Sequence, residues 1–369
     1  MTIEPMASDS GARTYPFVVG IELDGEGYHP AAWRRAAHEP DGLLTGRTLR
    51  DRVTAAENAG FTFATFEDSI LPPSTGPAGR IDALTRATFV AATTSTLGLV
   101  PVAAATYAEP FHLSSQLATL DYASRGRAGW LVADEPVAAA VAWGAAPRPA
   151  EAEIRRERTD SVEVARRLWD SWDDDAVVRD YATSRFLDRD RLHYIDFEGE
   201  SFAVKGPAIV PRPPQGQVVV FGYEPGGVDV VVVRGATTAA TVAAADEARN
   251  AGATLIFADL EVALDTPSAT AADRLADLDR HENTTATGRS AFAGTGAELV
   301  TLLTELSGRV DGVRLHPAVV DEDLPELFRL VLPPLLRSGL IRRPVPGSTL
   351  RANLGLSRPA NRYAKELSR

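Results

Sequence analysis

Short apolar runs alternate with longer amphipathic segments along most of this chain. Apolar runs of strand length are Phe17–Leu23, Phe61–Phe66, Leu97–Ala105 and Ala128–Ala133. Helical patterns between and after them cover Leu49–Ala59, Asp82–Thr96, a segment that starts at Pro110, and Glu151–Trp172. This alternation predicts a parallel sheet covered by helices.

The alternation is interrupted between residues 173 and 214. The segment from His193 to Val204 reads as a β-hairpin insertion. Strand patterns then resume at Gln217–Tyr223, Asp229–Arg234, Thr254–Leu260 and Gly312–Leu315, with helical patterns at Thr237–Gly252, Ala269–Leu278, Glu298–Leu306 and Leu324–Leu336. About eight strands predict a single (β/α)8 TIM barrel domain over residues 1–369, with an insertion at 173–214 and a tail at 342–369 that wraps the barrel or a partner.

Charge and composition exclude several classes of protein. The formal net charge is −12, which argues against binding to nucleic acid or anionic membranes. The chain has no cysteine, so disulfides and cysteine-ligated metals are excluded. No signal peptide and no apolar stretch of membrane-spanning length is visible, and we expect a cytoplasmic protein.

Polar residues follow the predicted strands at the end where TIM barrels carry their active sites. Asp68 follows the second strand, and Thr106 and Tyr107 follow the third. His112 begins the next helix, and His29 lies in the loop after the first strand. Three of these residues also have a purely structural interpretation. His112 could hydrogen-bond the backbone at the start of a helix, His29 could lie in a surface loop, and Asp68 could cap the next segment.

Several ordered motifs resemble one enzyme family. They are Tyr28–Arg34, Phe66–Ser69, Thr106–His112, Gly126–Trp130, Arg167–Trp172, Pro211–Gly216, Thr349–Arg351 and Arg358–Asn361. Together they resemble the bacterial-luciferase-like flavin monooxygenases, in the branch with the nitrilotriacetate and dibenzothiophene-sulfone monooxygenases. The resemblance implies a barrel that holds reduced FMN from a separate flavin reductase and oxygenates a small organic substrate.

The resemblance also implies site residues and assembly. We expect His112 and His29 to be catalytic. The expected cofactor-binding residues are Asp68, Thr106, Tyr107, Ala108, Arg155 and Gly222. We expect a homo-oligomer such as a dimer. No metal site is expected, because His193, His281 and His316 lack ligand spacing.

The chain departs from the family pattern around the cofactor. Ala108 replaces an asparagine, Asp134 and Glu135 replace hydroxyl residues, and Arg155 aligns with a tyrosine. After Gly222 the next strand begins almost at once, so the helix that meets a phosphate is predicted to be absent. We therefore expect FMN to bind weakly or not at all.

Three functions remain open from the sequence. The first is a flavin-dependent monooxygenase. The second is a barrel that has lost flavin and serves as a binding or subunit protein, which the altered phosphate site favours. The third is a deazaflavin-dependent oxidoreductase on the same barrel.

Overall fold

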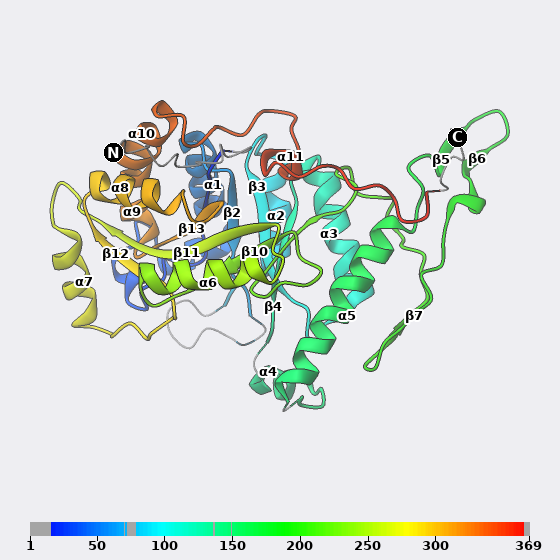
Figure 1. Ribbon diagram of the computed structural model, residues 1–369, viewed down its shortest axis with the longest axis horizontal. Helices are drawn as coiled ribbons and strands as arrows, with labels where there is room; N and C mark the ends of the chain where they lie inside the picture. Colours follow the sequence, from blue (N-terminus) through cyan, green and yellow to red (C-terminus); the bar gives the residue numbers. More distant parts are fainter. Residues whose placement is uncertain (1–15, 70, 72–78, 136, 149, 365–369) are drawn as a thin grey trace, which may run out of the picture.

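Eight parallel strands close into a barrel in the computed structural model, which describes residues 16–364 except 70, 72–78, 136 and 149. Around the ring, each strand pairs with the next, and the last pairs with β1. The ring consists of β1 (Val18–Glu22), β2 (Phe63–Phe66), β3 (Gly98–Ala104), β4 (Gly129–Ala133), β9 (Val219–Gly222), β10 (Val230–Val233), β11 (Leu255–Leu264) and β13 (Gly312–Pro317). The predicted barrel is confirmed, and β2 and β3 are parallel neighbours as expected (Figure 1).

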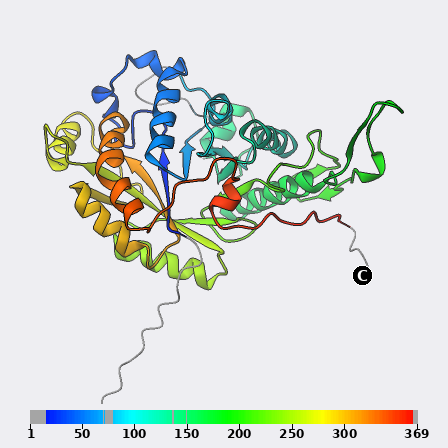
Figure 2. The same cartoon turned by 90° about the horizontal axis from the view of Figure 1, so that it is seen from above.

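Helices cover the outside of the ring, as the view from above shows (Figure 2). They are α1 (Arg47–Ala59), α2 (Ala83–Ala91), α3 (Pro110–Ser124), α4 (Val137–Trp143), α5 (Glu151–Asp170), α6 (Thr238–Asn250), α7 (Ala271–Asp279), α8 (Gly296–Leu306), α9 (Val320–Glu326) and α10 (Leu332–Arg337). Side-chain caps start several of them: Asp82 accepts a hydrogen bond from the Thr85 N–H at α2, and Thr295 and Glu298 form a capping box at α8. The helices α2 and α7 match the predicted segments, although α2 ends earlier than expected.

One connection lacks its helix. The strand β9 ends at Gly222 and β10 begins at Val230, and the residues between them form turns and bends. The prediction that no helix follows Gly222 is therefore confirmed. This shortened connection lies at the carboxyl end of the barrel, where other connections carry polar residues.

Alternate residues of each strand point into the barrel and fill it with apolar side chains. At its centre, the ring of Phe63 lies 5.3 Å from that of Phe221 and 5.8 Å from that of Phe257. Gly20 on β1 leaves the space for Phe63, because a Cβ at Gly20 would lie 2.2 Å from the Phe63 ring. The three rings therefore limit the size of the inward-facing side chains on neighbouring strands, as at Gly20.

The short helix α11 (Leu350–Asn353) closes the amino end of the barrel. Leu350 and Leu354 belong to the same buried cluster as Phe63. Gly98 and Gly129 make room for this plug, since a Cβ at either would lie within 3.2 Å of Leu350. The tail thus packs on the barrel, as one of the two predicted alternatives stated.

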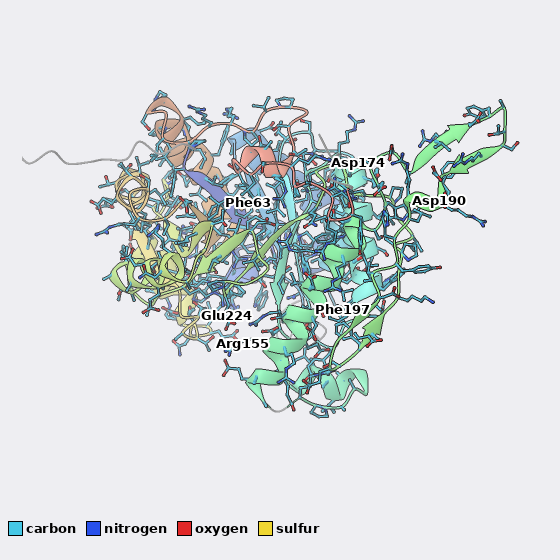
Figure 3. The ribbon with its side chains drawn as sticks, turned by 45° about the vertical axis from the view of Figure 1, so that its right-hand side comes forward. Phe63, Arg155, Asp174, Asp190, Phe197 and Glu224 are labelled. Carbon is cyan, nitrogen blue, oxygen red and sulfur yellow. The ribbon has the colours of Figure 1, made fainter. Side chains whose placement is uncertain are left out.

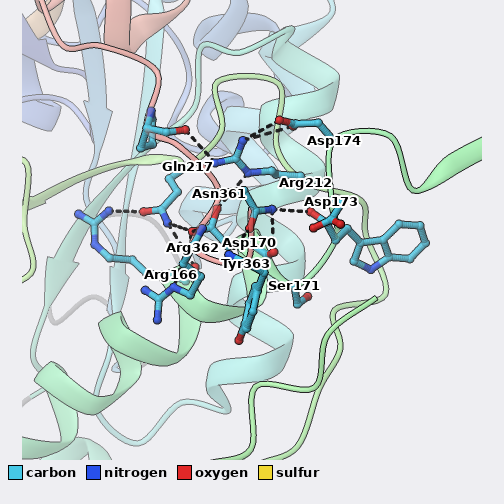
Figure 4. A network of polar contacts seen from close by, with 12 residues as sticks. Arg166, Asp170, Ser171, Asp173, Asp174, Arg212, Gln217, Asn361, Arg362 and Tyr363 are labelled. Carbon is cyan, nitrogen blue, oxygen red and sulfur yellow. Dashed lines mark hydrogen bonds and ion pairs between the residues drawn. The ribbon is translucent and has the colours of Figure 1, made fainter. Parts of the chain in front are cut away.

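Beyond α11 the tail follows α5 (Figure 1) and is held by a polar network (Figure 4). The Asn361 amide donates to the carbonyls of Asp170 and Trp172 at 2.9 and 2.8 Å. Arg212 donates to the Asp170 carboxylate at 3.0 Å and to the Pro359 carbonyl at 2.9 Å. The tail therefore ties the end of α5 to the segment that enters β9.

The insertion carries two small antiparallel pairs. The pair of β7 (Phe197–Glu198) and β8 (Ala203–Val204) corresponds to the predicted hairpin. A second hairpin of β5 (Val177–Asp180) and β6 (Arg185–Leu187) was not predicted, and it extends away from the barrel (Figure 2). The sequence also missed α4 and the strand β12 (Ser290–Gly294), which pairs with the carboxyl half of β11. Whether the barrel and the insertion form one domain stays a prediction.

No helix in the described part of the chain is long and apolar enough to cross a membrane.

We expect Gly20→Ala to lower the free energy of unfolding by about 1–3 kcal/mol, because the added methyl group overpacks the barrel against Phe63. Urea denaturation measures the change. The control is Gly308→Ala, where a Cβ would lie 3.5 Å from the Glu305 carbonyl, which is ordinary contact. Equal stability of the two variants would contradict the tight packing of Phe63.

Candidate active site

Polar and charged side chains occupy the carboxyl end of the barrel interior, above the three phenylalanines. They continue the inward-facing alternation of their strands, or lie just beyond the strand ends. This set, the mouth cluster, consists of Glu22, Thr65, Glu67, Tyr223, Arg234, Asp259, Arg314 and His316. The side chains at the ends of β3 and β4, Ala104 and Ala133, are small by contrast.

Asp259 and Arg314 form the centre of the mouth cluster. The Arg314 Nε and Nη2 groups donate to the two Asp259 carboxylate oxygens at 2.7 and 2.8 Å. Arg234 donates to Asp259 at 3.0 Å, and both arginines donate to the Tyr223 hydroxyl. Burial alone would raise the pKa of Asp259, but Arg314 and His316 hold it well below its usual range. Asp259 is therefore a fixed negative charge.

Glu22 lies at the edge of this centre. Its carboxylate accepts hydrogen bonds from the Thr65 hydroxyl at 2.6 Å and from the Asp24 N–H at 2.9 Å. The Arg314 Nη1 atom lies 3.6 Å from Glu22 and 3.7 Å from Glu67. Burial, followed by repulsion from Glu67, raises the pKa of Glu22 to about 7. Glu22 can therefore gain or lose a proton near neutral pH, as a general acid or base requires.

His316 stays neutral at ordinary pH. Burial, followed by repulsion from Arg314, lowers its pKa to about 3. Its Nε2 atom lies 3.1 Å from an Asp259 carboxylate oxygen. His316 is thus a neutral polar wall of the mouth.

The predicted residues Asp68 and Thr106 lie at neighbouring strand ends and act on the backbone. Asp68 accepts from the N–H groups of Ala83 and Ser69 at 2.6 and 2.9 Å, which orients the start of α2. The Thr106 hydroxyl accepts from the Glu135 N–H at 3.1 Å, and Ser69 donates to the Glu135 carboxylate at 3.0 Å. Hydrogen bonds therefore join the ends of β2, β3 and β4, and Glu135 is buried.

Tyr107 has a positive φ of 58°, which turns the chain sharply between β3 and α3. Its N–H donates to Glu157 at 3.2 Å, and its hydroxyl accepts from the Arg148 N–H at 2.9 Å. The Arg148 guanidinium lies 5.0 Å from the Tyr107 ring centroid and 2.7 Å from Glu157. Tyr107 is a wall beside the strand end, and the half-buried Ala108 follows it.

Arg155 lies near the start of α5, next to the shortened connection (Figure 3). It contacts Glu224 at 3.1 Å, and Arg158 donates to the same Glu224 oxygen at 2.6 Å. Arg158 also pairs with Asp134. Gly222 is the buried last residue of β9, immediately before this ion-pair group. We call Arg155, Arg158, Asp134 and Glu224 the α5 ion cluster.

His29 is buried and its ring is engaged on both sides. The Nδ1 atom accepts from the Ala31 N–H at 3.1 Å, so Nε2 carries the hydrogen that faces Asp279 at 3.2 Å. The ring lines a pocket between the first two strand–helix connections. Its bonds fix the loop after β1 and leave it no nitrogen for substrate.

His112 lies away from the other predicted residues. Its side chain is exposed on α3 and lines a groove with Phe89 of α2, Gln116 and Ile209. Asp68 does not line that groove, so the structure does not bring His112 and Asp68 into one pocket. The first turn of α3 directs this side chain to the outer helical layer.

One group of described residues has the spacing of metal ligands: Glu26, His38 and Asp321. Arg52 lies among them, donating to Glu26 at 2.9 Å and to Asp321 at 2.8 Å. The guanidinium already supplies the positive charge at this position.

The sequence reasoning missed the mouth cluster. Its signal is a polar or charged residue at every second position of strands that are otherwise apolar, as at Arg314 and His316 in β13. These residues are recognised as neighbours only when it is known which side chains of each strand point into the barrel. That is known only from the closed barrel.

Comparison with known proteins gives a consistent result. Residues 27–281 match the family described as luciferase-like monooxygenase. The chain is 26% identical to N-acetyl-S-(2-succino)cysteine monooxygenase of Bacillus subtilis (strain 168), covering 94% of this chain and 98% of that protein. It is also 26% identical to nitrilotriacetate monooxygenase component A of Aminobacter aminovorans, with the same coverage.

The alignments to these two relatives extend over 433 and 443 residues, more than the 369 of this chain, so both relatives contain residues that this chain lacks. Among solved structures, riboflavin lyase with modified FMN and riboflavin is similar, with a TM-score of 0.76 and 22% identity over 93% of this chain and 97% of that chain. This likeness shows the shared fold.

We expect the stability of the protein to fall as the pH rises from about 4.5 to about 7, because Glu22 then ionises more readily in the unfolded chain than in the folded one. Glu22→Gln removes this decline. Between about pH 5 and about pH 8, the variant should gain about 2–3 kcal/mol relative to the unmodified protein.

Urea denaturation at both pH values measures this difference. Asp121, whose pKa burial also raises to about 7, is present in both proteins and contributes equally. Parallel stability profiles for the two proteins would contradict the raised pKa of Glu22.

Proposed function

Because this chain belongs to the luciferase-like monooxygenase family, we propose that it is a flavin-dependent monooxygenase that oxygenates a small organic substrate with reduced FMN. The observation that carries the proposal is the family match over residues 27–281 of a closed barrel. Two relatives that cover 94% of this chain are named monooxygenases, which favours this function over a barrel that has lost flavin. The FMN in the similar riboflavin lyase supports the choice of cofactor.

Reduced flavin would supply the two electrons with which oxygen is split between product and water. We propose that the flavin ring lies at the barrel mouth beside Ala104 and Ala133, where the inward side chains are small. Thr106 and Tyr107 would form its walls there. Glu22, across the mouth, would hold or release a proton, since its pKa of about 7 suits that exchange.

The phosphate of FMN has no helix N-terminus to meet after β9, because the shortened connection leads directly to β10. Two cations beside this connection, Arg155 and Arg158, both contact Glu224. The residues therefore fit a phosphate only where it displaces the Glu224 carboxylate. This supports weak binding of FMN, as the sequence predicts. In this arrangement Asp68 and Gly222 shape the strand ends, and neither contacts the phosphate.

A separate flavin reductase as partner, homo-oligomeric assembly and a cytoplasmic location are further parts of the proposal. One of the similar relatives is named component A of its enzyme, which supports a separate component. Size-exclusion chromatography with light scattering tests the assembly.

The test of the function is anaerobic titration with reduced FMN, followed by supply of reduced FMN from an unrelated flavin reductase in air. The expected result is binding of reduced FMN and oxygenation of a substrate from a panel of small organic acids, sulfides and alkanes. Absence of binding by reduced FMN, riboflavin and a reduced deazaflavin would remove the proposal.

We expect Glu224→Gln to bind FMN about tenfold more tightly than the unmodified protein, with riboflavin binding unchanged. The physical reason is that half-exposed ion pairs contribute little, at most about 1 kcal/mol, whereas charge-assisted bonds from two arginines to phosphate contribute more. Isothermal titration calorimetry at fixed salt measures both ligands.

Glu200→Gln is the matched control, because it removes the same charge beside Arg156, which lies outside the α5 ion cluster. An equal gain in both variants would indicate a general charge effect. No gain in Glu224→Gln would show that Arg155 and Arg158 do not receive the phosphate.

A further inference from the structure

A pocket of about 310 Å³ opens at the carboxyl end of the barrel, between the connections that follow β1 and β2. The apolar part of its lining consists of Leu23, Trp33, Leu43, Leu44, Leu49 and Ile81. The volume lies at the lower end of the range for small-molecule sites. The pocket therefore has the size and the apolar lining that a small organic molecule requires.

The lining also contains two arginines that share one carboxylate. Arg86 donates through Nη1 to Asp24 at 2.5 Å, and Arg80 lies 3.4 Å from the other oxygen of Asp24. These three residues together carry one net positive charge. The nearby Asp68 carboxylate is held by the backbone N–H groups of Ser69 and Ala83.

Arg86 also has an unmet hydrogen bond. Its side chain is 8% exposed, and Arg86 Nη2 donates to the Glu67 carbonyl. Its Nε atom has no hydrogen-bond partner among the residues that the structure describes. A buried guanidinium N–H without a partner costs free energy, which an acceptor on a ligand would recover.

The third arginine of the lining, Arg52, is fully engaged. It donates to the Gly25 carbonyl at 2.5 Å, to Glu26 at 2.9 Å and to Asp321 at 2.8 Å. The available donors of the pocket are therefore concentrated at Arg80 and Arg86.

We propose that this pocket binds the substrate of the proposed monooxygenase, and that the substrate is a small molecule with an apolar body and one carboxylate. The carboxylate binds at Arg80 and Arg86, and the body lies against Trp33 and its apolar neighbours. The claim that the ligand is the substrate rests on the proposed function. The claim that the pocket binds a carboxylate rests on the lining of the pocket alone.

The pocket adjoins the barrel mouth. Arg86 contacts the Glu67 carbonyl, and the Glu67 side chain lies 3.7 Å from Arg314 of the mouth cluster. The Asp24 N–H also donates to Glu22. The arginine side of the pocket is therefore the side that adjoins the mouth, where chemistry is proposed.

Local charge is necessary for such a ligand, because the whole chain carries a formal net charge of −12 and repels anions at long range. Screening reduces that repulsion beyond about 8–10 Å at physiological salt. Inside the pocket, Arg52, Arg80 and Arg86 outnumber the two carboxylates of the lining, Asp24 and Glu26. The pocket therefore selects an anion by contact, with little electrostatic steering.

The experiment compares 4-phenylbutanoate with 4-phenylbutanamide, which differ in charge at similar size, by calorimetric titration of the full chain without flavin. We expect the carboxylate to bind about tenfold more tightly than the amide. In Arg80→Ala the difference between the two ligands should become smaller, because Arg86 and Asp24 then carry no net charge, and Arg80→Lys should restore part of it. Arg50→Ala is the control, since Arg50 is exposed on α1 and does not line the pocket.

Equal affinity for acid and amide, no binding of either, or an unchanged preference in Arg80→Ala would each overturn the inference. Flavin titrations of the same proteins separate the two proposals. If the unmodified protein binds flavin but does not prefer the carboxylate to the amide, only this inference is removed. Carboxylate binding without any flavin binding removes the monooxygenase and leaves the pocket.

Discussion

The ion pair of Asp259 and Arg314 is the interaction on which the carboxyl end of this barrel depends. Both side chains are almost fully buried, and two hydrogen bonds join them. A buried charge is tolerated only when it is paired and hydrogen-bonded, so neither residue can be changed alone without a large loss of stability. The pair fixes Tyr223 and Arg234 on one side and sets the potential at Glu22 and His316 on the other. The proton affinities of the mouth therefore depend on burial first and then on the charges of Glu67 and Arg314.

The barrel could be predicted from the sequence because its strands and helices differ in periodicity and because the motifs of a family recur in order. The absent helix after Gly222 was equally visible, since too few residues separate two apolar runs. The mouth cluster could not be predicted, because Asp259 and Arg314 are neighbours only after closure brings β11 beside β13. The position of His112 in its motif did not predict where its side chain lies. A residue at a helix start can face the barrel or the outer helical layer, and the sequence spacing does not distinguish the two.

The residues predicted to surround the cofactor have different structural roles. Asp68 and Thr106 hold the connections after β2, β3 and β4 in place through backbone hydrogen bonds. His29 fixes the loop after β1 by its two ring nitrogens. Arg155 belongs to an ion cluster that the chain closes with its own Glu224. Most of these side chains thus shape the site, while the titratable groups belong to the barrel interior.

The plug at the amino end of the barrel has a consequence for synthesis of the protein. A ribosome completes the eighth strand at Pro317, but the residues that seal the bottom of the core, Leu350 and Leu354, emerge only later. Until then Leu350 and Leu354 do not cover the buried cluster that contains Phe63. A nascent chain that lacks α11 therefore leaves part of this apolar cluster uncovered, and exposed apolar surface of this kind favours aggregation.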